Sequence, residues 1–321
     1  MTDFTGVTVV VNSRAEDGPL ESVIKAMPGC VVTRFNSDGM SPAVAVAQAI
    51  IYFTTMFKAQ DAKLVVVLGD RYETLAAALA AMFMKIPIAH IHGGETTTGA
   101  FDDALRHSIT QMADLHFVAT DRAFDEVHYR TGYTGQSRNP NIHLVGAPGL
   151  DGIQGNSAKR DRKLILVTYH PETMLPDNGV AQCEAMLNSF ETYCDDYEII
   201  FTGVNNDPGS NIIRTYIAQW VNMHFTNAVL KENLDHKAYI ALMQSAAVVV
   251  GNSSAGVIEA PWVGIPSVNI GKRQNGRPMA SSVCKDIETA LKWSGPWMPI
   301  YTGGASEKIA DKIKEWRDDA K

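Results

Sequence analysis

Short apolar, β-branched runs alternate along this chain with segments of helical character, and this alternation limits the possible folds more than any other feature. The first half contains runs at residues 7–11, 64–68, 86–91, 115–119 and 142–145. The second half repeats the rhythm at residues 164–168, 198–202, 228–230, 247–250 and 266–270. Strands that alternate with helices form parallel sheets with helices on both faces. The sequence therefore predicts an α/β protein with two doubly wound, Rossmann-like domains.

A polar stretch at residues 151–163, reading DGIQGNSAKRDRK, separates the two halves. We expect an N-terminal domain over residues 1–150 and a C-terminal domain over residues 151–300, with an active-site cleft between them. The last segment, residues 301–321, has apolar residues at helical spacing and is expected to form a helix that packs back on the first domain.

Composition excludes several classes of protein. The 321 residues are 45% hydrophobic, which is typical of a folded chain with sizeable cores. A net charge of −7 without a cluster of Lys or Arg argues against a nucleic-acid partner. The longest apolar run, residues 75–84, is short of the roughly 20 residues that cross a bilayer. No positively charged leader precedes the first strand, so we expect a cytoplasmic protein without membrane contact.

Several familiar site motifs are missing. The four cysteines form no C-x-x-C pair, which fits neither a zinc site nor a disulfide framework. Neither G-x-G-x-x-G nor a phosphate-binding P-loop motif follows any predicted strand. These absences argue against a nicotinamide dehydrogenase and against a nucleoside triphosphatase.

Polar residues follow the predicted strands, where open parallel sheets bind their ligands. Four acidic residues lie at or just beyond neighbouring strand ends of the first half, namely Asp70, Glu95, Asp102 and Asp103. Carboxylates gathered in one pocket shift one another's pKa values, as acid/base catalysis requires. His170 follows a strand of the second half. The alternative for Asp70 and the adjacent Arg71 is a helix cap beside a solvated arginine.

The string GNSSAG, residues 251–256, precedes a predicted helix that contains Glu259. Free backbone N–H groups and the hydroxyls of Ser253 and Ser254 favour a diphosphate site, with a serine cap as the alternative. Positive charge near the predicted loops suits an anionic ligand, and surface arginine is the alternative reading for Arg14, Lys272, Arg273 and Arg277.

Two further groups have alternative interpretations. His90 and His92 alternate on a predicted strand and would share one side of the sheet, which with Glu95 suggests a metal site. A hydrogen-bonding role is the stronger interpretation, because no metal-binding spacing is present. Asp103, Arg106 and His107 share a helix face and predict an internal polar network.

Six strings of this sequence together resemble the hydrolysing UDP-N-acetylglucosamine 2-epimerase family of sialic-acid-type sugar biosynthesis. They cover most of residues 64–277 and read GDRYETLAAA, HIHGGETTTGAFDDALRHSITQMADLHFVAT, VGAPGLD, YHPET, NNDPGS and GNSSAGVIEAPWVGIPSVNIGKRQNGR. The resemblance implies a glycosyltransferase-B-like fold that binds a UDP-sugar, without a metal or a nicotinamide cofactor. It also implies anti elimination of UDP to 2-acetamidoglucal, followed by hydration to N-acetylmannosamine.

The resemblance also implies roles for individual residues. Asp70 and Asp102 match catalytic carboxylates, and His170 matches the residue that assists the leaving phosphate. Relatives carry a catalytic Glu at the position of His92, so His92 and Glu95 are alternatives for that role. The matching UDP ligands are Arg14, Arg71, Ser253, Ser254, Glu259 and Arg273, and the loop with Asn205 and Asp207 resembles one near the nucleotide and sugar.

The same resemblance leaves alternatives open. UDP-2,4-diacetamido-2,4,6-trideoxyglucose is a second candidate substrate beside UDP-N-acetylglucosamine. A non-hydrolysing epimerase, a glycosyltransferase of the same fold and a catalytically silent UDP-sugar-binding protein are other interpretations. The chain between Arg14 and Gly69 is a few dozen residues shorter than is usual in the family, so a difference is expected in the sugar pocket wall, the oligomer interface or a regulatory site. A homodimer or homotetramer is expected.

Overall fold

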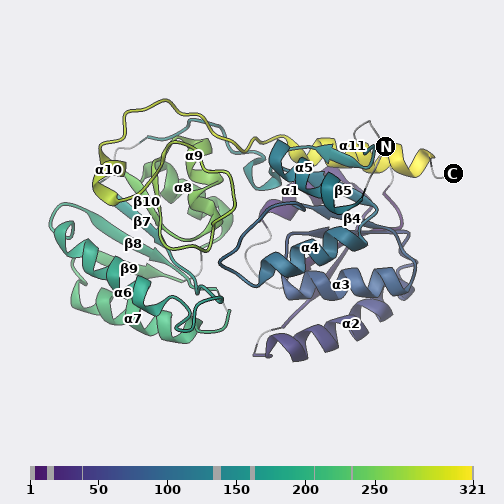
Figure 1. The fold of residues 1–321 in the computed structure, drawn as a ribbon, viewed down its shortest axis with the longest axis horizontal. Coiled ribbons are helices and arrows are strands. Elements are labelled where there is room, and N and C mark those ends of the chain that lie inside the picture. Colours follow the sequence, from purple (N-terminus) through teal and green to yellow (C-terminus); the bar gives the residue numbers. More distant parts are fainter. Residues whose placement is uncertain are drawn as a thin grey trace. The chain divides into compact units, whose positions relative to one another are not determined.

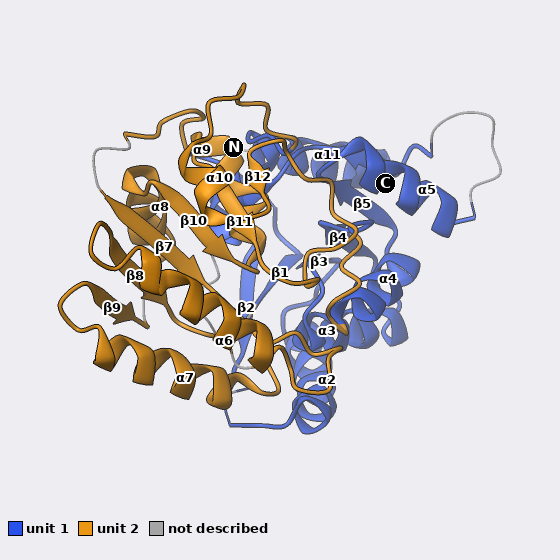
Figure 2. Ribbon diagram, turned by 60° about the vertical axis from the view of Figure 1, so that its left-hand side comes forward, with its two compact units in different colours: residues 1–95, 102–152, 301–321 blue, residues 96–101, 153–300 orange. Residues whose placement is uncertain are grey.

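The computed structural model describes residues 4–12, 18–37, 39–132, 139–159, 163–205, 207–232 and 234–319. The chain divides into two compact units, which Figure 2 shows in different colours. Unit 1 contains Met1–Glu95, Asp102–Gly152 and Tyr301–Lys321, and unit 2 contains Thr96–Phe101 and Ile153–Ile300. The chain therefore enters unit 2 twice, first as a short segment and then as the bulk of that unit.

The sheet of unit 1 is parallel, with the strand order β2-β1-β3-β4-β5-β6. Its strands are β1 Val7–Asn12, β2 Val31–Phe35, β3 Leu64–Leu68, β4 Ile88–Ile91, β5 Leu115–Val118 and β6 Ile142–Leu144. Its helices are α1 Gly18–Ala26, α2 Pro42–Ala59, α3 Tyr72–Phe83, α4 Asp102–Met112, α5 Asp121–Arg130 and α11 Ala305–Asp319, with a 3₁₀ turn, η2, at Pro148–Leu150 (Figure 1).

Alternation along β1 explains why helices cover both faces of this sheet. Successive side chains of a strand point to opposite faces. Val9 is buried in the cluster that includes Ile309 and Ile313 of α11, whereas Val10 is buried in the cluster that includes Phe53 of α2. A strand that is apolar on both faces is stable only as a central strand of a covered parallel sheet.

Among the described residues, α2 is the one helix that is long and apolar enough by composition to cross a membrane. We expected no such segment, because the longest uninterrupted apolar run is the shorter one at residues 75–84. That criterion overlooked α2, whose apolar residues are interrupted by polar ones. One face of α2 buries Ala45, Ala49, Phe53 and Phe57 in the core of unit 1. Core helices of folded proteins pass the same test, so this is weak evidence for a membrane segment.

Helix α11 completes unit 1 from the far end of the sequence. The Asp151 carboxylate accepts hydrogen bonds from the backbone N–H groups of Gly304, Ala305 and Ser306, at 2.5, 3.0 and 2.7 Å. These N–H groups at the start of a helix have no partner within the helix itself. Asp151 therefore fixes the first turn of α11 from a position more than 150 residues earlier in the chain.

The sheet of unit 2 is also parallel, with the order β12-β11-β10-β7-β8-β9. Its strands are β7 Leu164–Thr168, β8 Glu198–Thr202, β9 Ala228–Lys231, β10 Val248–Gly251, β11 Ser267–Asn269 and β12 Val283–Cys284. Its helices are α6 Val180–Ser189, α7 Ser210–Met223, α8 His236–Ser245, α9 Glu259–Val263 and α10 Ile287–Leu291, with 3₁₀ turns η3 Phe190–Thr192 and η4 Ser254–Gly256.

The predicted α/β class with two parallel sheets is confirmed, with local differences. The strand expected from residue 86 begins at Ile88, because the chain leaves α3 through Lys85 at a φ of 58° and Pro87 has no N–H to donate. Strand β12 was not predicted, since it has only two residues. The segment 96–101, between β4 and α4, belongs to unit 2, which no pattern in the sequence indicated.

Candidate functional site

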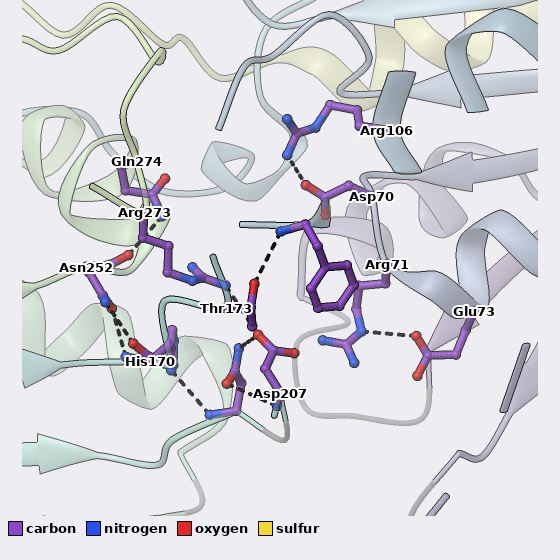
Figure 3. Close-up of polar contacts among 12 residues, drawn as sticks. Asp70, Arg71, Glu73, Arg106, His170, Thr173, Asp207, Asn252, Arg273 and Gln274 are labelled. Carbon is purple, nitrogen blue, oxygen red and sulfur yellow. Dashed lines mark hydrogen bonds and ion pairs between the residues drawn. The ribbon is translucent and has the colours of Figure 1, made fainter. Parts of the chain in front are cut away.

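In unit 1, the Asp70 carboxylate lies directly after β3 and forms an ion pair with the buried guanidinium of Arg106 on α4 (Figure 3). The same guanidinium donates to the backbone carbonyl of Glu95 at 2.8 Å and to Asp103 Oδ1 at 3.2 Å. Charge-assisted bonds of this kind fix geometry more strongly than neutral ones. Arg106 therefore holds the chain after β3, the chain after β4 and the first turn of α4 together.

The predicted network of Asp103, Arg106 and His107 is confirmed, with His107 Nε2 at 3.5 Å from Asp103 Oδ2. The pairing of Arg106 with Asp70 was not predicted. Spacing along a helix reveals which residues share a face, but it carries no information about a partner 36 residues earlier.

Arg71 extends from the start of α3 and is held by a carboxylate that the sequence reasoning missed. Arg71 Nε donates to Glu73 Oε2 at 3.2 Å, and the guanidinium lies 5.2 Å from the ring centroid of Tyr72. Glu73 is buried and also accepts from Ser37 Oγ at 2.5 Å. The Arg71 side chain is thus fixed by Glu73 and Tyr72, as Figure 3 shows for its bond to Glu73.

The other predicted catalytic residues of unit 1 have different surroundings. The Glu95 side chain is buried, and its Oε2 accepts a hydrogen bond from Tyr301 Oη at 2.9 Å. Asp102 is half-buried at the first position of α4. The prediction that His92 shares a strand face with His90 is wrong. Strand β4 ends at Ile91, and His92 has a φ of 62°, so it lies in a turn before two glycines.

In unit 2, a reciprocal pair of hydrogen bonds fixes the backbone of His170 after β7. Asn252 Oδ1 accepts from the His170 N–H at 2.7 Å, and Asn252 Nδ2 donates to the His170 carbonyl at 2.8 Å. The backbone N–H of Asn205 donates to His170 Nδ1 at 3.2 Å. Because Nδ1 accepts, the hydrogen of the neutral ring is on Nε2.

Asn205, Asp207 and Arg273 form a polar cluster beside His170 within unit 2, and Figure 3 labels Asp207, Arg273 and His170. Asn205 Nδ2 donates to Asp207 Oδ2, and an Arg273 guanidinium nitrogen lies 3.7 Å from the same oxygen. Asn205 and Asp207 are both buried. The ion pair with buried Asp207 restricts the Arg273 side chain, and a cation that is already held loses less entropy when it binds an anion.

The loop that carries Arg273 is anchored by two residues that the sequence reasoning missed. Glu172 is fully buried, its Oε1 accepts from the Lys272 N–H at 2.7 Å, and burial raises the pKa of Glu172 above its ordinary value. Gln274 Nε2 donates to the Asn252 carbonyl, and Gln274 Oε1 accepts from Arg277, both at 2.8 Å. Arg277 is therefore linked to the residue that holds His170.

Ser253 and Ser254 form the turn after β10, where the sequence left a diphosphate site and a helix cap as alternatives. Ser253 caps the 3₁₀ turn η4, because its Oγ accepts from the Ala255 N–H at 3.3 Å. Glu259 begins the short helix α9, and burial raises its pKa to about 7. Arg14 lies outside the described residues. Among the described residues, no three His, Cys, Asp or Glu side chains are grouped as metal ligands are.

Comparison with protein families gives a match to the model described as UDP-N-acetylglucosamine 2-epimerase, over residues 24–291. The chain belongs to this epimerase family. Its fold also resembles the crystal structure of Methanocaldococcus jannaschii UDP-GlcNAc 2-epimerase in complex with UDP-GlcNAc and UDP. The TM-score is 0.77 at 16% identity, over 96% of this chain and 99% of the other. The likeness confirms the predicted glycosyltransferase-B-like fold.

Two curated members of the epimerase family are about one-third identical to this chain. GDP/UDP-N,N'-diacetylbacillosamine 2-epimerase (hydrolyzing) of Campylobacter jejuni is 32% identical over 75% of this chain. UDP-N,N'-diacetylbacillosamine 2-epimerase (hydrolyzing) of Legionella pneumophila is 33% identical over 77% of it. The matched regions are 65% and 66% of those relatives' own lengths, so the chain spans just under two thirds of each.

Proposed function

We propose that this chain is a hydrolysing 2-epimerase that converts UDP-N-acetylglucosamine and water to N-acetylmannosamine and UDP. The observation that carries the proposal is the Asp70 carboxylate, held by Arg106 at the carboxyl end of β3 in a chain that belongs to the epimerase family. A carboxylate held in one orientation at a strand end is suited to take or give a proton at a bound sugar.

The proposed reaction has two stages. In the first, a base removes the proton from C2 while the bond between C1 and the UDP oxygen breaks on the opposite face, which leaves 2-acetamidoglucal and UDP. In the second, water adds to C1 and a proton is added to C2 from the other face, which gives N-acetylmannosamine. We assign the proton transfers to Asp70 and Asp102, together with either Glu95 or His92.

We propose that polar groups of unit 2 bind the departing UDP, and that Arg71 and Arg14 are further UDP ligands. His170 carries its ring hydrogen on Nε2 when neutral, and it would donate that hydrogen to the leaving phosphate. Arg273, with Arg277, would balance the diphosphate charge, and the turn at Ser253 and Ser254 would contribute hydroxyls. The half-buried Glu259 would accept from ribose hydroxyls, and the Asn205–Asp207 loop would lie beside the nucleotide.

The second candidate substrate is UDP-2,4-diacetamido-2,4,6-trideoxyglucose, the sugar nucleotide that the names of the Campylobacter and Legionella relatives describe. It undergoes the same elimination and hydration, since C1 and C2 of the two sugars carry the same groups. We also propose that the chain forms a homodimer or homotetramer, to be tested by light scattering after size exclusion.

The deciding experiment follows purified protein with each UDP-sugar in D₂O by proton NMR. Release of UDP together with a free manno-configured sugar deuterated at C2 supports the proposal and identifies the substrate. A UDP-linked manno sugar would identify a non-hydrolysing epimerase. Transfer of the sugar to an added acceptor without C2 exchange would identify a glycosyltransferase. With no turnover of either sugar, the proposal fails, and UDP binding by calorimetry would then indicate a silent binding protein.

Asp70→Asn is the variant that tests the role of Asp70 in proton transfer. It keeps an oxygen that accepts from Arg106 but is not a base at neutral pH, so turnover should fall at least about 100-fold while UDP binding remains. Unchanged turnover would contradict the assignment of Asp70.

A further inference from the structure

His90 lies completely buried in β4, next to the turn that carries Asp70, and the proposed mechanism gives it no task. His90 Nε2 lies 2.8 Å from the carbonyl oxygen of Gly69. The hydroxyl of Thr110 on α4 lies 3.2 Å from the other ring nitrogen, Nδ1. Both ring nitrogens therefore have partners in elements that hold Asp70.

These contacts fix the tautomer of the ring. A carbonyl oxygen can only accept, so the hydrogen of His90 is on Nε2, and Nδ1 accepts from the Thr110 hydroxyl. Burial lowers the pKa of His90 to about 3, so the ring stays neutral at physiological pH. The neutral ring therefore donates from Nε2 to the Gly69 carbonyl throughout the neutral pH range.

The hydrogen bond acts on Asp70 through the peptide bond. The Gly69 carbonyl and the Asp70 N–H belong to one planar peptide group, so fixing the carbonyl also fixes the direction of the Asp70 N–H. The Gly69 N–H donates to the Ile91 carbonyl at 2.9 Å, so β4 holds Gly69 on both sides. Gly69 has a φ of 78°, a conformation that glycine adopts without strain.

Two side chains of α4 also help to fix the position of Asp70. Arg106, which pairs with the Asp70 carboxylate, and Thr110, which orients His90, are one turn apart on α4 and are both buried. Residues four apart on a helix share a face. The same face of α4 thus fixes the Asp70 carboxylate directly and the Asp70 backbone through His90.

We propose that His90 is a positioning residue for the reaction, which orients Asp70 by donating a hydrogen bond from Nε2 to the carbonyl of Gly69. The inference rests on the proposed function for Asp70. His90 does not touch the sugar and exchanges no proton with it. Thr110 serves the same purpose one step further away, by keeping the hydrogen of His90 on Nε2.

The test compares three substitutions. His90→Leu removes the donor at similar volume, and His90→Gln returns an amide N–H near the position of Nε2. The matched control is His116→Leu, because His116 is buried at the position of β5 that pairs with His90 in register. Each variant is measured for UDP release with the sugar that the wild type turns over, for KM and for the midpoint of urea unfolding.

We expect His90→Leu to lower kcat about 100-fold while KM changes less than about threefold, since a small misplacement of a catalytic group has such an effect. His90→Gln should recover most of that loss. His116→Leu should lower the unfolding midpoint as much as His90→Leu but leave kcat nearly unchanged. Equal losses of kcat in the two Leu variants, or no recovery in His90→Gln, would overturn the proposal.

A second measurement does not need activity. Long-range ¹H–¹⁵N spectra of histidine-labelled protein report which ring nitrogen of His90 carries the hydrogen, with His90→Gln used for assignment. Hydrogen on Nε2 from pH 6 to pH 8 agrees with the proposal, whereas hydrogen on Nδ1 or a charged ring overturns it. If the wild type releases no UDP from either sugar, the proposed function has failed, and these spectra still decide whether the hydrogen bond to Gly69 exists.

Discussion

Asn252 holds the backbone of His170 on both sides, with its amide oxygen 2.7 Å from the His170 N–H and its amide nitrogen 2.8 Å from the His170 carbonyl. The two residues are 82 positions apart and follow adjacent strands, β7 and β10. Because β7 and β10 are central neighbours in the sheet of unit 2, the contact joins the strand end that carries His170 to the strand end that carries Ser253 and Ser254.

The first prediction concerns Asn252→Asp, which keeps the oxygen that accepts from His170 and replaces the donor with a second oxygen. A carboxylate oxygen facing the His170 carbonyl in a buried site should lower the free energy of unfolding by about 1–3 kcal/mol. It should also reduce UDP release, because His170 loses its orientation. Urea unfolding and the UDP-release assay check both effects. Asn269→Asp, at the half-buried last residue of β11, is the control, and an equal loss there would refute the explanation.

The second prediction concerns pH and Glu259, whose pKa burial raises from 4.5 to about 7. Between these values the folded chain keeps a proton that the unfolded chain has released, so the free energy of unfolding falls as pH rises. Relative to Glu259→Gln, the wild type should lose roughly 2–3 kcal/mol from pH 4.5 to pH 7. Urea unfolding of both proteins without UDP, at several pH values, measures this difference. Parallel curves would show that Glu259 titrates normally.

The third prediction concerns the segment 96–101, which packs in unit 2 against the loop that carries Arg273. The Thr98 N–H donates to the Asn275 carbonyl at 3.0 Å, and a Cβ on Gly99 would overlap the Lys272 carbonyl. Gly99→Ala should therefore displace the segment and lower stability by about 1–3 kcal/mol. Hydrogen exchange at residues 96–101 should become faster. Thr98→Ala keeps the backbone bond and should exchange as the wild type does.

The fourth prediction concerns the cap of α11. Asp151→Ala leaves the N–H groups of Gly304, Ala305 and Ser306 without their carboxylate, and should lower the free energy of unfolding by about 1–2 kcal/mol. Asp151→Asn keeps one acceptor and should lose less. Asp311→Ala, on the exposed side of α11, should change stability by less than about 0.5 kcal/mol. A similar loss for Asp151→Ala and Asp311→Ala would mean that the cap contributes little.

The local sequence pattern predicted most strands of this fold, but few of the contacts between residues that are distant in the sequence. The runs at residues 64–68, 164–168 and 198–202 match β3, β7 and β8, because the interior strands of a covered parallel sheet are mostly apolar. Strand β12 has two residues, and its Val283 pairs with Ser267 of β11. Too few residues take part for a periodic signal, so this strand depends on its neighbour rather than on its own sequence.

The polar contacts of the site also divide into those that local spacing predicts and those that it does not. The shared helix face of Asp103 and Arg106 follows from their spacing, but the partners of Arg106 at Asp70 and Glu95 follow from the order of strands in the sheet. His92 was misplaced because alternation was extended beyond Ile91, where a left-handed turn ends the strand. Contacts between residues distant in sequence, such as that of Asn252 with His170, have no local signal.

The position of α11 has a consequence for biosynthesis. Ile309 and Ile313 of this helix belong to the same core as Val7 and Val9, so unit 1 stays incomplete until the ribosome has released residues 305–319. Residues 96–101 and 153–300 emerge earlier and contain all of unit 2. Although its first strand is made first, unit 1 is expected to reach its final fold second. In nascent chains halted before residue 305, unit 2 should resist protease while unit 1 is still cleaved.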